Sequence, residues 1–558
     1  MRKTWYSFCL SIVLIVACLA SEAAWAAPAG DCDCSGQVTI DELVRIVGIA
    51  IGDEAVQTCP VADTNHDGRV GVDEVVLSVS GALSGTERAI VALRGVIEGF
   101  YGPPYTFGQR LDLLRFLATA GMNAYVYAPK NDPLHRELWR DPYPPEFLDH
   151  FAELAATGEK IGVRFAFALS PGKGLDPEAG DAARVQEKLG SLMDVGVRHF
   201  CLFFDDVAAD EPGADPDVQV SLVNDTFAFL RGRDPEATLC FISNFYAGTA
   251  EQMATDSSPF AALYPTPSSV YFEAYRRLAP EIPILWTGAF VFSDPITLEQ
   301  ARHFREFVGR PLILWDNYPV NDVALTRELF LGPYTGREAG LETALEGVFM
   351  NTMLQPQASK IALWTAARFF EQGACYDGAA SLDEALGAVA GTSGADALGA
   401  LAEHFQGHPL IGDGAEAERL ATAIGAFFAD ESPAARAELV SLLERYAANE
   451  AELDATLANR ALFEEVREPA RKLARLGQAA LAALDLLERA GSGEEVDAGP
   501  LEEMIATANI IPWNVGANTP LPPSLALLLG GHDATPADVF GAFFQRVRDE
   551  IAGASAEK

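Results

Sequence analysis

Short apolar runs alternate with amphipathic stretches between residues 94 and 351, and this alternation limits the fold more than any other feature of the chain. Eight runs are predicted to be strands, at 95–100, 124–129, 163–170, 199–206, 238–245, 282–288, 311–317 and 347–351. Stretches with helical periodicity separate most of them, at 109–120, 145–159, 181–194, 219–231, 268–278 and 297–308. Nearly continuous apolar strands joined by helices are typical of parallel strands buried on both faces. Eight of them predict an α/β fold of the (β/α)₈ TIM-barrel type, with a doubly wound open sheet as the alternative.

Polar and aromatic residues follow nearly every predicted strand. In a barrel of this kind, functional side chains lie at the C-terminal ends of the strands. The strand ends carry Gly99, Tyr101, Lys130, Ser170, Asp205, Asp206, Tyr246, Thr287, Trp315, Asn317 and Asn351. Taken singly, a buried aromatic residue is more often part of the core, and a lysine is more often on the surface. Together they predict a pocket for a hydroxylated ligand.

The adjacent carboxylates Asp205 and Asp206 end the fourth predicted strand. Like charges this close raise the pKa of one of them, although an aspartate here also commonly caps a helix. Two neighbours in one strand cannot flank a glycosidic bond, as most two-carboxylate hydrolases require. They can act from one side when a 2-acetamido group of the substrate is the nucleophile. One aspartate then holds the amide N–H, and the other protonates the leaving oxygen and later activates water.

Six segments in matching order carry a family resemblance. They are GVIEGFYGPPY (95–105), YAPKNDPLHR (127–136), FFDDV (203–207), LWTG (285–288), LWDNYPVND (314–322) and FLGPYTGR (330–337). They resemble signatures of the retaining β-N-acetylglucosaminidases of glycoside hydrolase family 84, which includes protein O-GlcNAcases and secreted bacterial enzymes once called hyaluronidases. The resemblance covers residues 94–370. It implies removal of terminal β-linked GlcNAc from O-GlcNAc protein or glycans through an oxazoline intermediate, with no catalytic cofactor.

The resemblance also assigns roles to single residues. It implies that Asp205 orients and polarises the acetamido group and that Asp206 is the general acid/base. The remaining residues of the predicted substrate site are Gly99, Tyr101, Lys130, Tyr246, Thr287, Trp315, Asn317, Asp322 and Asn351. Three positions depart from the family pattern: ISNFY stands around Tyr246 where PTEY is usual, Val323 stands where some members have Tyr, and MNTM surrounds Asn351. These departures concern the predicted aglycone contacts.

A duplicated twelve-residue pattern precedes the predicted barrel, as DCDCSGQVTIDE (31–42) and DTNHDGRVGVDE (63–74). Oxygen ligands at positions 1, 3 and 5, Gly at 6 and Glu at 12 are the EF-hand requirement for Ca²⁺. The predicted ligands are Asp31, Asp33, Ser35, the Gln37 carbonyl, Glu42, Asp63, Asn65, Asp67, the Arg69 carbonyl and Glu74. The repeat resembles dockerin modules and related extracellular EF-hand pairs. That resemblance implies two structural Ca²⁺ ions and a cohesin-like protein partner, with attachment or spacing alone, or metal-free turns, as alternatives.

The N-terminus has the pattern of a secretory signal peptide over residues 1–26, because Arg2 and Lys3 precede an apolar stretch and then small residues. A retained anchor and lipid attachment at Cys18 are the alternatives. We therefore expect a secreted, extracellular or periplasmic protein. Export permits a disulfide between Cys59 and either Cys32 or Cys34. No pairing is predicted for Cys201, Cys240 and Cys375, which are scattered.

Net charge and the pattern of the C-terminal region complete the predictions. A net charge of −39 argues against nucleic-acid partners, and it makes polyanionic hyaluronan a poor substrate unless the cleft is locally basic. Residues 380–558 predict a helical bundle, with Leu439, Leu442, Leu443, Tyr446, Leu453 and Leu457 on one face and an interruption at 511–523. The predicted organisation is a calcium module at 30–86, a catalytic barrel at 92–375 and this helical domain. The rival functions are an endo-acting hyaluronidase and a non-catalytic, calcium-dependent sugar-binding scaffold.

Overall fold

The computed structural model describes residues 30–34, 38–64, 68–84, 91–325, 328–406, 417–430, 432–511 and 539–556. The predicted signal peptide, Cys18 and the predicted calcium ligands Ser35, Gln37, Asn65 and Asp67 lie outside these residues. The described chain forms two compact units. One contains the residues up to Val91 together with Ala339–Ala344 and Phe370–Tyr376, and the other contains Ala92–Glu338, Leu345–Phe369 and the chain from Asp377 onward. The domain limits given above stay predictions.

Eight parallel strands form a closed barrel in which each strand pairs with the next along the chain and the last pairs with the first. The strands are β1 (Leu93–Glu98), β2 (Ala124–Tyr127), β3 (Arg164–Leu169), β4 (His199–Phe203), β5 (Thr238–Ile242), β6 (Ile284–Trp286), β7 (Leu312–Asp316) and β8 (Gly347–Asn351). The predicted barrel is therefore confirmed. Seven of the predicted strands run one to three residues past the observed ends, and those extra residues form the start of the loops that line the pocket.

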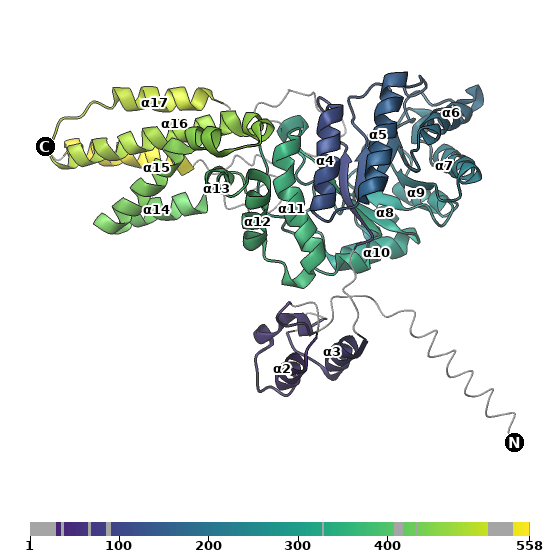
Figure 1. The fold of residues 1–558 in the computed structure, drawn as a ribbon, viewed down its shortest axis with the longest axis horizontal. Helices are drawn as coiled ribbons and strands as arrows, with labels where there is room; N and C mark the ends of the chain where they lie inside the picture. The colour runs from purple at the N-terminus through teal and green to yellow at the C-terminus, as the bar shows by residue number, and fades with distance from the viewer. Residues whose placement is uncertain are drawn as a thin grey trace. The chain divides into compact units, whose positions relative to one another are not determined.

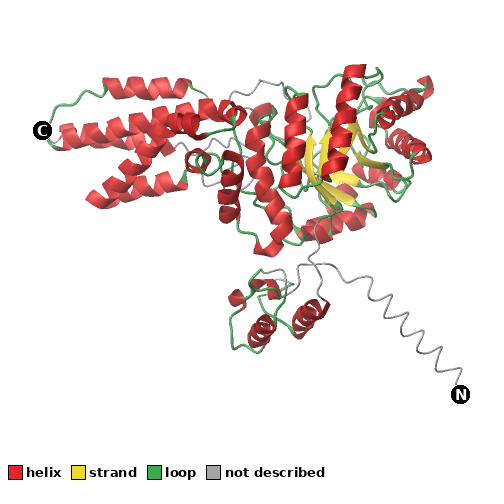
Figure 2. Ribbon diagram, viewed as in Figure 1, coloured by secondary structure: helices red, strands yellow, loops and turns green. Residues whose placement is uncertain are grey.

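Helices surround the barrel, as Figure 2 shows in red around the yellow strands. They are α4 (Phe107–Thr119), α5 (Pro145–Ile161), α6 (Asp181–Asp194), α7 (Pro216–Arg233), α8 (Ala250–Ala254), α9 (Ser268–Tyr275), α10 (Leu298–Val308) and α11 (Pro356–Gln372). Local sequence sets their limits. Thr106 and Thr297 form capping boxes at the starts of α4 and α10, and left-handed Gly162 and Gly309 end α5 and α10. Short 3₁₀ helices, Val323–Leu325 and Leu341–Thr343, replace a long helix between β7 and β8.

A disulfide joins Cys201 of β4 to Cys240 of β5, which are direct partners in the strand register. Both side chains face a cavity inside the barrel. Because side chains alternate along a strand, Cys201, Phe203 and Asp205 all face the barrel interior. Asp205 lines a second pocket, at the opposite end of the barrel from this cavity. The scattered positions of these cysteines in the sequence concealed this pairing, because the register between two strands brings them together.

The helical region continues from the barrel through α12 (Gly378–Ala390), α13 (Ala395–Ala402), α14 (Glu418–Asp430), α15 (Pro433–Thr456), α16 (Arg460–Gly491), α17 (Gly499–Ile510) and α19 (Val539–Ala556) (Figure 1). The predicted apolar face of α15 is buried, including Leu439 and Tyr446. Glu465 of α16 accepts the backbone N–H groups of Gln357 and Ala358 at the start of α11, so the two regions share a helix cap. Among the described residues, no helix has both the length and the apolar character needed to cross a membrane.

In the described part of the N-terminal unit, the α-helices α2 (Ile40–Ala50) and α3 (Val72–Ser84) each begin within the last three residues of one of the duplicated loops. Its core contains Ile46, Ile49, Cys59, Ala62 and Val70. Cys59 pairs with Cys32, one of the two predicted partners. Cys34 pairs instead with Cys375, which was not predicted because 341 residues separate them.

Candidate active site

The C-terminal ends of the strands surround an open pocket of about 420 Å³. The structure brings together at this pocket both aspartates and all nine residues of the predicted substrate site. Its lining is Gly99, Tyr101, Lys130, Asp205, Asp206, Ile242, Tyr246, Thr287, Val291, Phe292, Trp315, Asn317, Val320, Asp322 and Asn351. Ser170, the remaining polar strand end, is buried and does not line it.

Asp205 is a buried carboxylate whose two oxygens differ. Its Oδ2 forms an ion pair with the ammonium of Lys130, and both side chains are almost completely inaccessible to water. The same ammonium lies over the ring of Trp315, 5.4 Å from its centroid. Oδ1 of Asp205 is buried without a hydrogen-bond partner among the described residues. An unsatisfied buried acceptor is costly, so Oδ1 is suited to receive a donor from a bound ligand.

Asp206 faces the same pocket because its backbone leaves the strand conformation. Consecutive side chains of a strand point to opposite faces, but Asp206 has a φ of 54° in the left-handed region, which aspartate tolerates better than most residues. Both carboxylate oxygens accept tyrosine hydroxyls: Tyr101 donates to Oδ2 at 2.7 Å and Tyr246 donates to Oδ1 at 2.8 Å. Burial, together with the charge of Asp206, raises the pKa of both tyrosines well above its usual value, so both remain donors.

Arg136 is a polar neighbour of this pair that sequence reasoning missed. Its guanidinium donates to the Tyr101 hydroxyl at 2.7 Å and to the backbone carbonyl of Asp206 at 3.2 Å. The signal available was its place in the YAPKNDPLHR segment, in which only Lys130 was given a role. The apolar lining residues Ile242, Val291, Phe292 and Val320 were also missed, because nothing distinguishes them from core residues in the sequence.

Trp315, Asn317 and Asn351 form a hydrogen-bonded wall of the pocket. Oδ1 of Asn317 accepts the indole N–H of Trp315 at 2.9 Å and the amide of Asn351 at 3.0 Å. The backbone N–H of Gly99 donates to Oδ1 of Asn351 at 3.2 Å. A Cβ atom at Gly99 would lie 2.4 Å from the Trp315 ring, so the wall requires glycine at this position. Asn317 also donates to the carbonyl of Val291, which fastens the loop after β6.

Asp322 and Thr287 complete the polar lining. Oδ2 of Asp322 accepts the backbone N–H of Tyr101 at 2.7 Å. Burial, with a contribution from the charge of Asp206, raises the pKa of Asp322 to about 7. The hydroxyl of Thr287 donates to the carbonyl of Phe290 at 2.8 Å, within the same loop after β6. Asp322 is therefore a third carboxyl group in the pocket, and its own charge changes near neutral pH.

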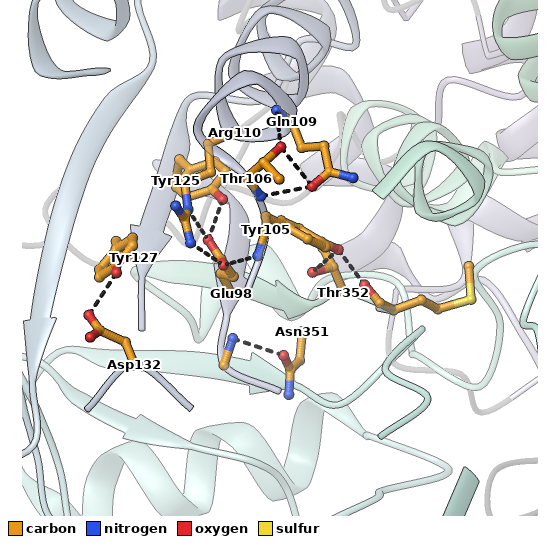
Figure 3. A network of polar contacts seen from close by, with 12 residues as sticks. Glu98, Tyr105, Thr106, Gln109, Arg110, Tyr125, Tyr127, Asp132, Asn351 and Thr352 are labelled. Atoms are coloured by element: carbon orange, nitrogen blue, oxygen red, sulfur yellow. Dashed lines mark hydrogen bonds and ion pairs between the residues drawn. The ribbon is translucent and has the colours of Figure 1, made fainter. Parts of the chain in front are cut away.

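A second layer of polar contacts holds the loop after β1 in place (Figure 3). Glu98 forms a two-bond ion pair with Arg110, at 2.8 Å for each bond, and accepts the Tyr125 hydroxyl and the backbone N–H of Tyr105. Glu98 is buried and directly precedes Gly99. Because every bond of the Glu98 carboxylate goes to the scaffold, this residue fixes the backbone from which Gly99 and Tyr101 reach the pocket.

The duplicated loops bring carboxylates together in the N-terminal unit. Within the described chain, Asp31, Asp33 and Glu42 are grouped closely enough to hold one metal ion. In the second loop, the N–H of Gly68 donates to Oδ2 of Asp63 at 2.8 Å, and Glu74 is almost fully buried. Gly68 has a φ of 81°, as the sharp turn at position 6 requires. The donor set consists of hard oxygens and fits Ca²⁺.

A closed barrel with two neighbouring carboxylates in a polar pocket defines the class of (β/α)₈-barrel glycoside hydrolases. Residues 94–403, more than half of the chain, match the family model described as NAGidase, beta-N-acetylglucosaminidase. The chain therefore belongs to the beta-N-acetylglucosaminidase family that this model describes.

Known relatives and structures agree with this assignment. The chain is 33% identical over 307 residues to "Protein O-GlcNAcase" of Rattus norvegicus and 33% identical over 304 residues to that of Mus musculus. Each match covers 53% of this chain, but the chain spans only about a third of the length of these curated relatives. A mutant O-GlcNAc hydrolase of Thermobaculum terrenum has a TM-score of 0.66 at 25% identity, covering 83% of this chain and 96% of its own. The structure described as CpGH84B has a TM-score of 0.65 at 26% identity, covering 83% and 78%.

Proposed function

We propose that this protein is a retaining exo-β-N-acetylglucosaminidase that removes terminal β-linked GlcNAc by substrate-assisted catalysis. The observation that carries the proposal is the unpartnered, buried Oδ1 of Asp205 beside Asp206. A 2-acetamido group offers the N–H that this oxygen lacks. The relatives named as O-GlcNAcases support O-GlcNAc protein as one source of the substrate.

The proposed reaction has two steps. In the first, the acetamido oxygen bonds to C1 while the bond from C1 to the leaving oxygen breaks. Asp205 accepts the amide N–H and stabilises the developing positive charge, and Asp206 gives its proton to the leaving oxygen. In the second, Asp206 takes a proton from water as that water attacks C1, and the oxazoline opens with overall retention. The ion pair between Lys130 and Oδ2 holds the Asp205 carboxylate in place for this contact.

The rival endo-acting hyaluronidase is less well supported. Among the described residues that line the pocket, Lys130 is the cationic one, and its ammonium is already paired with Asp205. A polyanionic chain would therefore meet carboxylates with little compensating charge. The experiment that separates the two functions is release of 4-nitrophenol from its N-acetyl-β-glucosaminide, compared with product analysis on hyaluronan oligomers. We expect β-GlcNAc as the first-formed anomer by NMR. Internal cleavage of hyaluronan without release of terminal GlcNAc would contradict the proposal.

We also infer that the duplicated loops bind two structural Ca²⁺ ions. Glu42 and Glu74 would close the two sites as bidentate ligands, with Asp31 and Asp63 at the first positions. Each of these four carboxylates is at least nine-tenths buried. Backbone N–H groups of the same loops bind Glu42 and Glu74, so both carboxylates are fixed at position 12, where a Ca²⁺ loop needs them. Isothermal titration of the metal-free protein with Ca²⁺ tests this, and two sites are expected in the intact chain. Loss of one site in Glu42→Gln and of the other in Glu74→Gln would support the assignment.

The N-terminal unit also supports the proposed protein partner. Exposed apolar side chains recur at the same spacing, 32 residues apart. They are Ile40, Val44 and Val47 on α2 with Ile51 just after it, and Val72, Val76, Val79 and Leu83 on α3, where Leu77 is exposed as well. Exposed apolar stripes of this kind mark interaction surfaces. We propose that a cohesin-like module with an apolar face covers one of these two sets of exposed side chains at a time, either the set at α2 or the set at α3. Titration with a purified cohesin module tests this, and V44D/V76D should abolish binding. Self-association of the wild type, or no binding to any cohesin, would contradict it.

Export remains part of the proposal. All six cysteines beyond residue 26 are paired in disulfides, and disulfides persist in oxidising compartments. We therefore propose that the protein works outside the cytoplasm, as a secreted, periplasmic or Cys18-lipidated form. Fractionation of the producing cells, with mass spectrometry of the mature N-terminus, distinguishes these forms. Full-length protein in the cytoplasm with free thiols would contradict export.

A further inference from the structure

The hydrogen bonds around Asp206 have directions that donor chemistry fixes. A guanidinium has only donors and stays protonated, so the 2.7 Å contact between Arg136 and the Tyr101 hydroxyl must use the tyrosine oxygen as acceptor. Tyr101 has a single hydroxyl hydrogen. With its oxygen accepting from Arg136, that hydrogen points to Oδ2 of Asp206, 2.7 Å away. Oδ2 therefore always faces a donor.

The other oxygen of Asp206 is in a different situation. Oδ1 accepts the Tyr246 hydroxyl at 2.8 Å. No other hydrogen bond holds the Tyr246 hydroxyl among the residues that the structure describes. Its hydrogen can therefore turn away, and its oxygen can then accept a proton carried by Oδ1. Protonation of Oδ2 would instead place two hydrogens against each other between Asp206 and Tyr101.

We propose that Arg136 is a positioning residue that, through Tyr101, places the catalytic proton of Asp206 on Oδ1, the oxygen facing Tyr246. The inference rests on the proposed role of Asp206 as general acid/base. Arg136 holds the backbone as well, because its second nitrogen donates to the Asp206 carbonyl at 3.2 Å. It also lies 5.6 Å from the centroid of the Tyr101 ring, a second contact between the two side chains.

Arg136 is one of several charged or titratable groups around Asp206. Lys130 is paired with the neighbouring Asp205, Asp322 binds the backbone of Tyr101, and the Tyr264 hydroxyl donates to the carbonyl of Val207. Arg136 differs from Lys130 in its contacts. Arg136 donates to the Tyr101 hydroxyl, which donates to Asp206, whereas Lys130 is paired with the carboxylate of Asp205.

The test is the pH profile of kcat/KM for a substrate with a poor leaving group, since its alkaline limb reports the protonated acid. In Arg136→Met the cation is lost and Tyr101 can turn to accept, so both effects stabilise the protonated form. We expect the alkaline limb to move up by about one unit. Arg136→Lys keeps a charged donor and should restore the wild-type limb in part. Arg310→Met is the matched control, because Arg310 is a buried arginine that binds only backbone carbonyls away from the pocket.

A double-mutant cycle separates action through Tyr101 from a general charge effect. If Arg136 acts through Tyr101, the limb shift in R136M/Y101F is clearly smaller than the sum of the two single shifts. Additive shifts, or an R136M limb that coincides with wild type, would overturn the inference. If R136M does not fold, Y101F alone must raise the limb, and an unchanged limb overturns it equally. Failure of the proposed function is seen separately, as an Asp206→Asn variant whose pH profile still shows the alkaline limb.

Discussion

Lys130 binds one carboxylate oxygen of Asp205 and leaves the other, Oδ1, buried without a hydrogen-bond partner in the part of the chain that the structure describes. The two oxygens therefore differ in function: Oδ2 is paired with the Lys130 ammonium, and Oδ1 can accept a hydrogen bond from a ligand. An ionised carboxylate held in this way costs no reorganisation when positive charge develops in the substrate. Asp206 has a different arrangement, since tyrosine hydroxyls bind both of its oxygens and Tyr246, on Oδ1, is the one that can turn to accept a proton.

Replacement of Asp205 by asparagine should lower turnover for every leaving group, because ring closure of the acetamido group needs the negative charge. We expect a loss of about 3–4 kcal/mol in transition-state stabilisation. Rates on methyl, nitrophenyl and dinitrophenyl glycosides check this. A loss confined to the poor leaving groups would show that Asp205 is an acid and not the amide partner.

Replacement of Asp206 by asparagine should have the complementary pattern. An activated leaving group departs without a proton, so the first step for a dinitrophenyl glycoside should be largely spared. For a methyl glycoside we expect a loss of about 10²–10⁴-fold, the usual contribution of general acid catalysis. Pre-steady-state release of dinitrophenol is the measurement. Equal losses on both substrates would remove Asp206 from the acid role.

Asp322 should make the protein less stable as the pH rises. Its folded-state pKa is raised from 3.8 to about 7, mainly by burial, so the folded protein keeps a proton that the unfolded chain has already released. Stability from this group is present at low pH and is lost between about pH 4 and 7. Asp322→Asn carries no charge, so its Tm relative to wild type should be higher at about pH 8 than at about pH 5, while its KM rises. A Tm difference independent of pH would contradict this.

Removal of calcium should loosen the N-terminal unit and leave turnover nearly unchanged. Glu42 and Glu74 would lose the cation that each is proposed to share with the other carboxylates of its loop, whereas the pocket residues belong to the other unit. Hydrogen exchange over residues 38–84 with and without chelator measures the loosening, and the expected Kd is about 10⁻⁴ M or tighter. A chelator that abolishes activity, with recovery on adding Ca²⁺, would show that the unit supports the pocket.

The barrel could be predicted from the sequence because buried parallel strands leave a distinct apolar pattern. Most pocket residues followed, since the strand ends of such a barrel meet at one face. Asp322 came from the family resemblance alone, and Ser170, although a strand end, does not line the pocket. Asp205 and Asp206 show the limit of that reasoning: strand periodicity alone would point them apart, and the left-handed backbone at Asp206 brings both to the pocket. No pattern in the sequence predicts a left-handed backbone conformation at Asp206.

The contacts between distant segments could not be predicted. The Cys201–Cys240 pair depends on the register of β4 against β5, and the Cys34–Cys375 pair depends on the return of the chain after α11. The role of Arg136 could not be predicted for the same reason, because its partners Tyr101 and Asp206 lie on two other loops. The sequence indicates which residues end the strands, but only the folded chain shows which of them touch.

The measurement that tests the central claim most directly is the rate of turnover on substrates with a progressively fluorinated N-acetyl group. Fluorine withdraws electrons from the amide carbonyl, so an acetamido oxygen that attacks C1 becomes a poorer nucleophile. With Asp205 and Asp206 in their proposed roles, kcat/KM should fall steeply from the acetyl to the mono-, di- and trifluoroacetyl sugar. A rate that does not depend on fluorination, with a sugar trapped covalently on Asp205 or Asp206, would contradict substrate assistance and assign the pair a conventional nucleophilic role.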